Sequence, residues 1–220
     1  GTAIAGAVGL QVATTGWNEK RLRAADRVLA EGLVHRLVAG AFERAGLADS
    51  RIGKGRKDDP ADVAQNRAIV EDAVGMPVAY MDQVHGAEVV EVTDAVSVPT
   101  CEAVVTARPG LALAVLVADC TPVLLVDREA GVVGAAHAGR PGMQARVVPA
   151  AVEAMRDLGA VDLRATVGPS VCGRCYEVPD EMRSAAAAVA PVSAAVTWSG
   201  TPAIDVASGV VDQLTGAGVP

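Results

Sequence analysis

The stretch Leu111–Gly139, LALAVLVADCTPVLLVDREAGVVGAAHAG, decides the fold of this 220-residue chain. It predicts three buried strands in succession. An apolar run ends before Cys120, a second begins at Pro122, and a third follows the polar turn Asp127–Gly131 and ends at His137. Strands that are apolar on both faces belong in the middle of a sheet. The pattern therefore places a thiol and an imidazole together at one edge of a packed core.

The sequence on either side of this stretch mixes strands and helices without a regular βαβ alternation. We expect further strands at 4–14, 78–84, 88–92, 103–106, 163–167 and 195–198. We expect helices at 19–37, at 60–74, at 141–158 with a kink or break at Pro149, from Pro179, and at 205–215. No linker, repeat or low-complexity stretch divides the chain. The prediction is one α+β domain.

Composition narrows the class of protein. Half of the residues are apolar (51%) but only 2% are aromatic, so the core must be packed from alanine, valine and leucine. The net charge of −7 argues against nucleic acid or an anionic membrane as the main partner. The longest apolar run is far shorter than the ~20 residues of a membrane helix, and no signal peptide opens the chain. We expect a cytoplasmic protein, a monomer or a small homo-oligomer.

Histidine and cysteine are scarce, and three of them occur at the ends of predicted strands. The histidines are His35, His85 and His137, and the cysteines are Cys101, Cys120, Cys172 and Cys175. Two imidazoles and one thiolate form the ligand set of a metal site with an open position. On residue chemistry alone, His85, Cys120 and His137 are either such a site or three separate core residues.

Five motifs extend the argument: RKDDPADVAQNR at 56–67, QVHG at 83–86, ADCTPVLLVD at 118–127, AAHAG at 135–139 and GPSVCGRCYEV at 168–178. Through them the sequence resembles the laccase-domain purine nucleoside phosphorylases, proteins once described as multicopper polyphenol oxidases. The resemblance covers roughly residues 38–215, and the motifs keep the family's order.

The resemblance implies one domain over residues 1–220, with two packed mixed β-sheets flanked by helices in α/β/β/α layers. It also implies that this chain stops short of a C-terminal segment that closes the family fold. It implies zinc bound by His85, Cys120 and His137. The implied activities are phosphorolysis of adenosine, inosine, guanosine and methylthioadenosine, and adenosine deamination, with phosphate and zinc-bound water as the nucleophiles.

Further site residues follow from the resemblance and from the chemistry of these reactions. Asp119 is a candidate for the carboxylate that zinc deaminases pair with the metal, or it orients a ligand or caps a turn. Arg140 stands one position before the family's usual arginine. Together with the following helix N-terminus and Arg44, it is expected to bind phosphate. Gln83 is expected at the substrate site, and Tyr176 either stacks on the purine or is a core tyrosine.

Two other functions are compatible with the same residues. Three histidines are too few for a four-copper cluster, but a single copper centre needs only the trio and a weak methionine ligand such as Met81. A metal-free hydrolase or deamidase, similar in fold to a bacterial toxin domain, would use Cys120 as nucleophile and His137 as base.

The Cys172-x-x-Cys175 pair has the spacing of a redox pair or of half a zinc site. No second pair completes a closed zinc site, and no strand-to-helix context supports a thioredoxin-like motif. We interpret the two residues as small buried side chains in a turn that lines the site wall at most.

Overall fold

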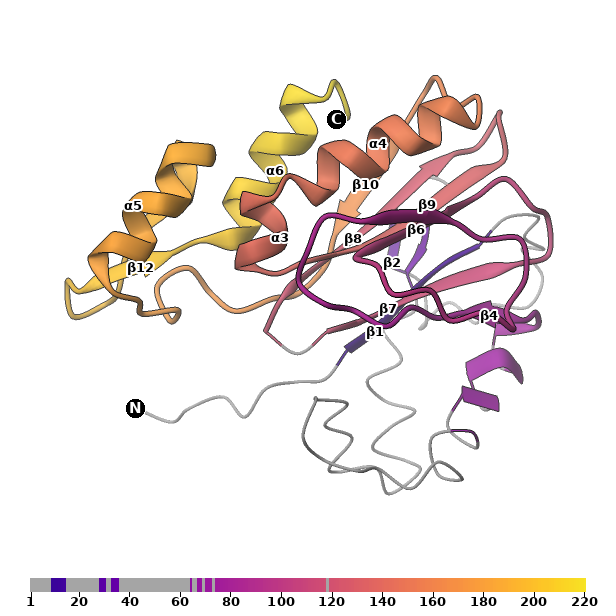
Figure 1. Ribbon diagram of the computed structural model, residues 1–220, viewed down its shortest axis with the longest axis horizontal. Coiled ribbons are helices and arrows are strands. Elements are labelled where there is room, and N and C mark those ends of the chain that lie inside the picture. The colour runs from indigo at the N-terminus through magenta and orange to yellow at the C-terminus, as the bar shows by residue number, and fades with distance from the viewer. Residues whose placement is uncertain are drawn as a thin grey trace.

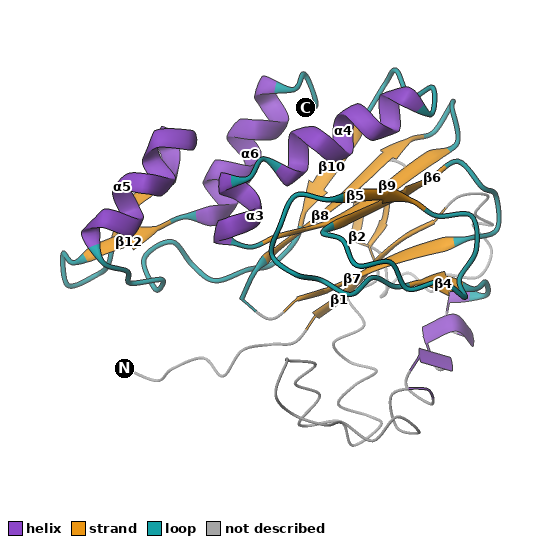
Figure 2. Ribbon diagram, in the orientation of Figure 1, coloured by secondary structure: helices purple, strands orange, loops and turns teal. Residues whose placement is uncertain are grey.

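The fold consists of two β-sheets packed face to face, with helices on their outer faces (Figures 1 and 2). The computed structural model describes residues 9–14, 28–30, 33–35, 64, 67–68, 70–72, 74–117 and 119–220. The predicted fold class, α+β with two packed mixed β-sheets flanked by helices, is confirmed.

The larger sheet has five strands in the order β10-β8-β9-β6-β5. These are β10 (Arg164–Val167), β8 (Thr121–Asp127), β9 (Val132–Ala138), β6 (Ala103–Thr106) and β5 (Val89–Glu91). Neighbouring strands are antiparallel except β5 and β6, which are parallel. The smaller sheet has the order β1-β7-β4, formed by β1 (Gly9–Thr14), β7 (Ala112–Val117) and β4 (Val78–Ala79).

The chain crosses from one sheet to the other inside the stretch that decides the fold. The three predicted strands form, but β7 belongs to the smaller sheet, whereas β8 and β9 make a hairpin in the larger one. In this hairpin Thr121 is opposite Ala138 and Pro122 is opposite His137. Cys120, which directly precedes β8, therefore lies at the same end of the sheet as His137, as predicted.

Alternation along the central strands explains why they are apolar on both faces. In β7, Leu113 and Val115 belong to the core between the sheets, whereas Ala112 and Ala114 face outward. Their outer neighbours include Val70, on a helix formed by the described residues between 64 and 74. Side chains that follow the period of two thus fill two cores at once.

Helices cover the outer face of the larger sheet (Figure 1). They are α3 (Arg140–Gln144), α4 (Val147–Asp157) and α6 (Val206–Gly216). A fourth helix, α5 (Asp180–Val189), packs on the hairpin of β11 (Ala194–Val196) and β12 (Pro202–Ile204), beside the 3-10 turn η3 (Pro191–Ser193). The core under the helices is built from alanine, valine, leucine and methionine, as the scarcity of aromatic residues requires.

The helix predicted at 141–158 is divided into two helices, and the break lies three residues before the expected position at Pro149. The break falls at Arg146, whose φ of 65° is left-handed, and α4 begins at Val147. Pro149 then lies in the first turn of α4, where a missing N–H breaks no helical hydrogen bond.

Two expectations near the N-terminus differ from the structure. The helix predicted at 19–37 is wrong for its described residues, which form the antiparallel strands β2 (Val28–Ala30) and β3 (Leu33–His35). In this pair Val28 is opposite His35 and Ala30 is opposite Leu33. The strand expected at 78–84 is only two residues long in β4, because the chain leaves the sheet toward His85.

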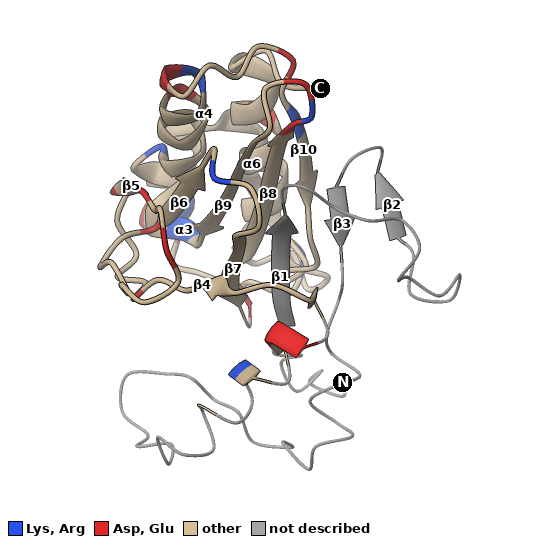
Figure 3. Cartoon of the chain, turned by 90° about the vertical axis from the view of Figure 1, so that its right-hand side faces the viewer, with Lys and Arg blue, Asp and Glu red and all other residues tan. Residues whose placement is uncertain are grey.

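Within the described part of the chain, charged residues lie mainly on loops and helices, and the strands contain few of them (Figure 3). Within the described residues, no helix has both the length and the apolar character that crossing a membrane requires.

Candidate metal centre

Three segments that are far apart in the sequence bring His85, Cys120 and His137 together. His85 lies in the loop between β4 and β5, Cys120 in the crossing from β7 to β8, and His137 on β9. Their ligand atoms all lie within 4.8 Å of one another. Cys120 Sγ is 3.8 Å from His85 Nε2, and the two imidazole rings are nearly perpendicular, with centroids 4.9 Å apart. Among the residues that the structure describes, this is the one such group of metal-ligating side chains.

The backbone at His85 is held in an unusual conformation. Its φ of 63° lies in the left-handed region, which residues other than glycine rarely adopt. The N–H groups of Val84 and His85 both donate to Oε1 of Glu102. Strained backbone that its surroundings maintain is typical of functional sites. Here it turns the imidazole toward Cys120.

Glu102 connects two of the three ligands and is fully buried. Its Oε2 is 2.6 Å from Nδ1 of His137, and its backbone oxygen accepts a hydrogen bond of 2.8 Å from the N–H of the same histidine. A histidine that binds a metal usually donates its second ring N–H to a carboxylate in this way, which fixes the ring and its tautomer. Glu102 is not among the site residues that the sequence predicts.

The electrostatics of this pair favour a charged carboxylate. Burial by itself would raise the pKa of Glu102, but its hydrogen bonds with His137 and with the N–H groups of His85 and Val84 lower it. Burial would likewise lower the pKa of His137, but its interactions with Cys120 and Glu102 raise that pKa to about 9. The site thus attracts positive charge, either a proton or a metal cation.

Two glycines let the backbone approach the ligands closely. A Cβ at Gly139 would lie 2.8 Å from Cys120 Sγ and 3.1 Å from His85 Cδ2. A Cβ at Gly142 would lie 3.2 Å from the backbone oxygen of His137.

The three donor atoms form the kind of site that zinc and copper prefer, so the residues fit such a metal and leave one position for another ligand.

The side chain of Gln83 continues the smaller sheet where β4 ends. Its Nε2 donates to the backbone oxygen of Leu116 at 2.7 Å, and its Oε1 accepts from the N–H of Leu116 at 3.0 Å. This pairing fixes the loop two residues before His85. The predicted contact of Gln83 with substrate remains a prediction.

Arg140, the first residue of α3, directly follows Gly139. Its Nη1 donates to Gln144 Oε1 at 2.8 Å. Its Nε is buried and has no hydrogen-bond partner within the described part of the chain. A buried donor of this kind beside the ligand cluster is available for an anion.

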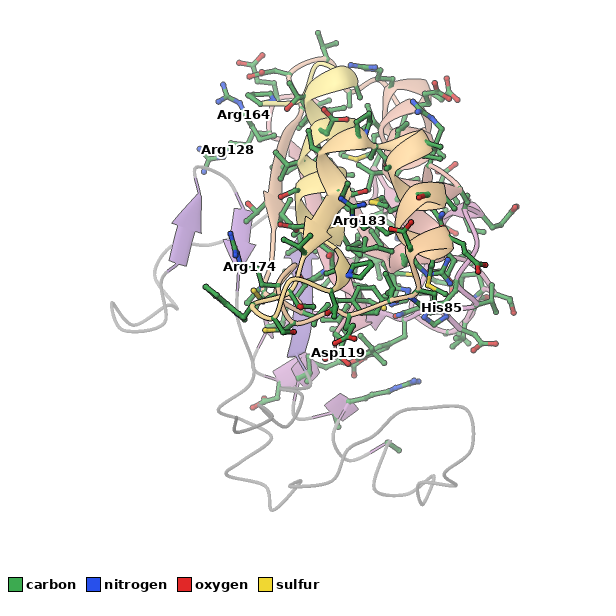
Figure 4. All side chains as sticks on the ribbon, turned by 90° about the vertical axis from the view of Figure 1, so that its left-hand side faces the viewer. His85, Asp119, Arg128, Arg164, Arg174 and Arg183 are labelled. Atoms are coloured by element: carbon green, nitrogen blue, oxygen red, sulfur yellow. The ribbon has the colours of Figure 1, made fainter. Side chains whose placement is uncertain are left out.

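The other predicted site residues are less closely tied to the trio. Asp119 is exposed, and its backbone oxygen accepts a hydrogen bond of 2.9 Å from Val171. Figure 4 shows Asp119 and His85 toward one end of the molecule and Arg128 toward the other. Tyr176 is half-buried and packs against the core under the helices. Arg44 lies outside the described residues.

Cys172 and Cys175 lie in a turn, as predicted, but both are exposed rather than buried. The turn follows β10 and precedes α5. Its thiols do not belong to the His85–Cys120–His137 group.

Comparison with known sequences identifies the family of the chain. A family profile described as multi-copper polyphenol oxidoreductase laccase matches residues 38–220. A Streptomyces coelicolor protein named purine nucleoside phosphorylase SCO2081 is 55% identical over 189 residues, which cover 82% of this chain and 78% of the relative. The Mycobacterium tuberculosis protein named purine nucleoside phosphorylase Rv2149c is 46% identical over 188 residues, covering 82% and 75%.

Solved structures show the same fold. Protein NMB0706 of Neisseria meningitidis superimposes with a TM-score of 0.68 at 32% identity, covering 76% of this chain and 71% of that one. YlmD of Geobacillus stearothermophilus gives a TM-score of 0.68 at 30% identity, covering 77% and 70%. The chain therefore belongs to the laccase-domain family of proteins.

Proposed function

We propose that the protein is a zinc-dependent purine nucleoside phosphorylase. Its proposed substrates are phosphate and adenosine, inosine, guanosine or methylthioadenosine, and it also deaminates adenosine at the same centre. The convergence of His85, Cys120 and His137 within 4.8 Å carries the proposal. Relatives between 40% and 55% identical that bear the name purine nucleoside phosphorylase support it. The expected cytoplasmic location suits these substrates.

The protein's own groups prepare the ligands for a metal. Glu102 holds the Nδ1 proton of His137 and leaves Nε2 free to bind a cation. Cys120 supplies the anionic ligand, and the strained backbone of His85 aims the second imidazole at the same point. When bound there, zinc supplies Lewis-acid chemistry at one open coordination position.

Arg140 is the proposed phosphate ligand. Its guanidinium has one donor engaged by Gln144 and a buried Nε with no protein partner in the described residues. Arginine binds phosphate oxygens in a bidentate fashion, so it would orient this nucleophile toward the sugar carbon that bears the purine. We do not propose that the N-terminus of α3 binds phosphate, because α3 has only five residues.

Asp119 is our proposal for the carboxylate that transfers protons during deamination, since it directly precedes Cys120 and is exposed to solvent. Tyr176 and Arg44 keep their predicted roles as purine and phosphate contacts. Gln83 is proposed to act by positioning the loop of His85, through its two hydrogen bonds with Leu116.

The test is an incubation of zinc-loaded protein with adenosine, with and without phosphate, followed by chromatography of the products. We expect adenine and ribose 1-phosphate only when phosphate is present, and inosine in both cases. A Cys120→Ala variant should form none of the three. If wild-type protein with stoichiometric zinc forms none of them, the proposed substrates are wrong.

A second candidate is a metal-free Cys-His hydrolase or deamidase, and one observation favours it. Cys120, His137 and Glu102 interact in series, which is the arrangement of nucleophile, base and orienting carboxylate. A strong chelator separates the two functions. Loss of activity on chelation, with recovery on adding zinc, supports the metal enzyme, whereas undiminished activity supports the hydrolase.

The single-copper alternative uses the same trio with Met81, which is buried in the core between the sheets. Loading with copper(II) distinguishes the two. Intense visible colour without nucleoside chemistry would favour the copper protein.

A further inference from the structure

Cys172 and Cys175 stand at the two ends of one hydrogen-bonded turn. The N–H of Cys175 donates to the backbone oxygen of Cys172 at 2.8 Å, and the N–H of Tyr176 donates to the same oxygen at 3.1 Å. The ends of such a turn have Cα atoms less than about 7 Å apart, and a disulfide requires Cα atoms within about that distance. Both thiols are free and exposed. The backbone therefore already brings the two side chains within bonding reach.

The two thiols have different environments. The backbone N–H of Arg174 donates to Cys172 Sγ at 3.4 Å, a contact that stabilises a thiolate. The pKa of the Cys175 thiol is raised, first by its side-chain hydrogen bond with Cys172. The backbone contact at Cys172 Sγ makes Cys172 the candidate attacking cysteine and Cys175 the candidate resolving cysteine.

The turn is also fixed against its neighbours. A Cβ at Gly173 would lie 2.5 Å from Cβ of Asp205 and 2.8 Å from its Oδ2, so this position accepts only glycine. Asp205 in turn caps α6, because its side chain accepts a hydrogen bond from the N–H of Ser208 at 2.9 Å. Little conformational entropy remains to be lost when the two sulfurs join.

Small molecules can reach this turn from solvent. Figure 4 shows Arg174 at the edge of the molecule, well away from His85. Its guanidinium lies over the ring of Trp198, 4.7 Å from the centroid, and 77% of Trp198 is exposed. The turn therefore faces outward at Arg174.

We propose that Cys172 and Cys175 are a redox-active pair that forms a reversible disulfide by exchange with a low-molecular-weight disulfide of the glutathione type. The Cys172 thiolate attacks one sulfur of that disulfide, whose S–S bond breaks and releases one thiolate. Cys175 then loses its proton and attacks the Cys172 sulfur, which releases the second thiolate. Two protein thiols are oxidised, and one small disulfide is reduced to two thiols.

The experiment equilibrates the full chain in glutathione buffers of increasing oxidised fraction, then blocks free thiols and maps the disulfides by mass spectrometry. The background is Cys120→Ala, which removes the other thiol near the surface. We expect a 172–175 disulfide whose fraction follows the glutathione ratio and reverses on reduction. With Cys175→Ser added, glutathione should stay attached to Cys172. With Cys172→Ser added, no intramolecular disulfide should form.

A second readout uses Trp198. In a Trp17→Phe background its emission should change in step with disulfide formation, because its indole lies beside the turn. The proposal is overturned if no 172–175 disulfide forms in the folded protein at any glutathione ratio, or if it forms only after denaturation. Neither result bears on the nucleoside chemistry.

Discussion

The buried carboxylate of Glu102 contacts Nδ1 of His137 and accepts a hydrogen bond from the backbone N–H of His85. Its charge should therefore matter for metal binding. Glu102→Gln keeps the size of the side chain but loses the negative charge beside His137. We expect roughly a 10- to 100-fold weaker affinity for zinc, which is the usual effect of removing such a partner. Competition with a coloured chelator measures it. The exposed Glu129→Gln is the matched control, and equal affinities in the two variants would refute the role of Glu102.

Gly139 gives a second test at the scale of single residues, because its missing side chain makes room for two ligands. In Gly139→Ala the new methyl group would overlap Cys120 Sγ and press on His85. We expect zinc binding to fall at least as far as in Glu102→Gln. Gly86→Ala is the matched control, since a Cβ there meets nothing within 4 Å. Equal zinc affinity in the two alanine variants, measured by the same competition, would show that the close approach is irrelevant.

Arg140 should separate the two proposed reactions. Arg140→Ala removes the proposed phosphate ligand but none of the metal ligands. We expect adenosine phosphorolysis to fall by roughly the factor of 10² or more that a lost charge-assisted contact costs, with a raised KM for phosphate and little change in deamination. Arg128→Ala, on the distant turn, controls for the loss of positive charge (Figure 4). Equal losses in both reactions would remove the phosphate role.

At the residue scale, the sequence indicates the three residues of the candidate metal site but not the residues that orient them. His85, Cys120 and His137 are rare residue types that end predicted strands, so they can be recognised. Glu102 differs from other glutamates only by its burial, which depends on contacts between distant segments. In the sequence, the only indication of its role is that a charged residue interrupts the apolar run 101–106. The sequence likewise cannot show that the amide of Gln83 pairs with Leu116, and its expected contact with substrate stays a prediction.

Among the structural elements, the hairpin of β8 and β9 depends on Asp127 at the end of β8. Its Oδ1 accepts from the N–H of Ala130 at 2.9 Å, and its Oδ2 accepts from those of Val161 and Asp162 at 2.6 and 2.8 Å. Burial would raise the pKa of this carboxyl, but these N–H donors lower it below its usual value. The carboxylate thus ties the hairpin turn to the segment that leads into β10.

Asp127→Asn should lower the free energy of unfolding by about 1–3 kcal/mol near neutral pH, because an amide cannot accept all three bonds. A carboxyl whose pKa is lowered by folding stabilises the protein above its unfolded pKa of about 3.9, and this stabilisation is lost as the pH falls through the lower folded value. Urea unfolding from neutral pH to about pH 3 should therefore show the difference from wild type shrinking. A constant difference, or one matched by the exposed Asp212→Asn, would contradict this assignment.

Helices and strands could be predicted from the sequence where the apolar pattern was long and local. They could not be predicted where contacts between distant segments decide the pairing. The apolar runs 103–106 and 111–138 gave strands because both of their faces are buried. That β7 pairs in a different sheet from β8 cannot be read from the runs themselves. At 28–35 helical spacing was misleading, because the pairing of β2 with β3 outweighs a weak local preference.

For the molecule as a whole, the metal should act as a cross-link. His85 and Cys120 lie on connections between the two sheets and His137 lies on β9, and the unfolded chain does not hold them together. Zinc at roughly 100 times its Kd should therefore stabilise the fold by about 2.7 kcal/mol and raise the Tm. Thermal unfolding with zinc and with chelator measures this. In Cys120→Ala the two curves should nearly coincide, and a full zinc effect in that variant would place the ion elsewhere.

The most direct test of the central claim is to titrate zinc into metal-free protein while measuring phosphate-dependent release of adenine from adenosine. The account predicts activity near zero without metal, a linear rise to one zinc per chain, and a plateau beyond that ratio. Undiminished activity in the metal-free protein, or a rise that continues well beyond one equivalent, would contradict a single catalytic metal at His85, Cys120 and His137.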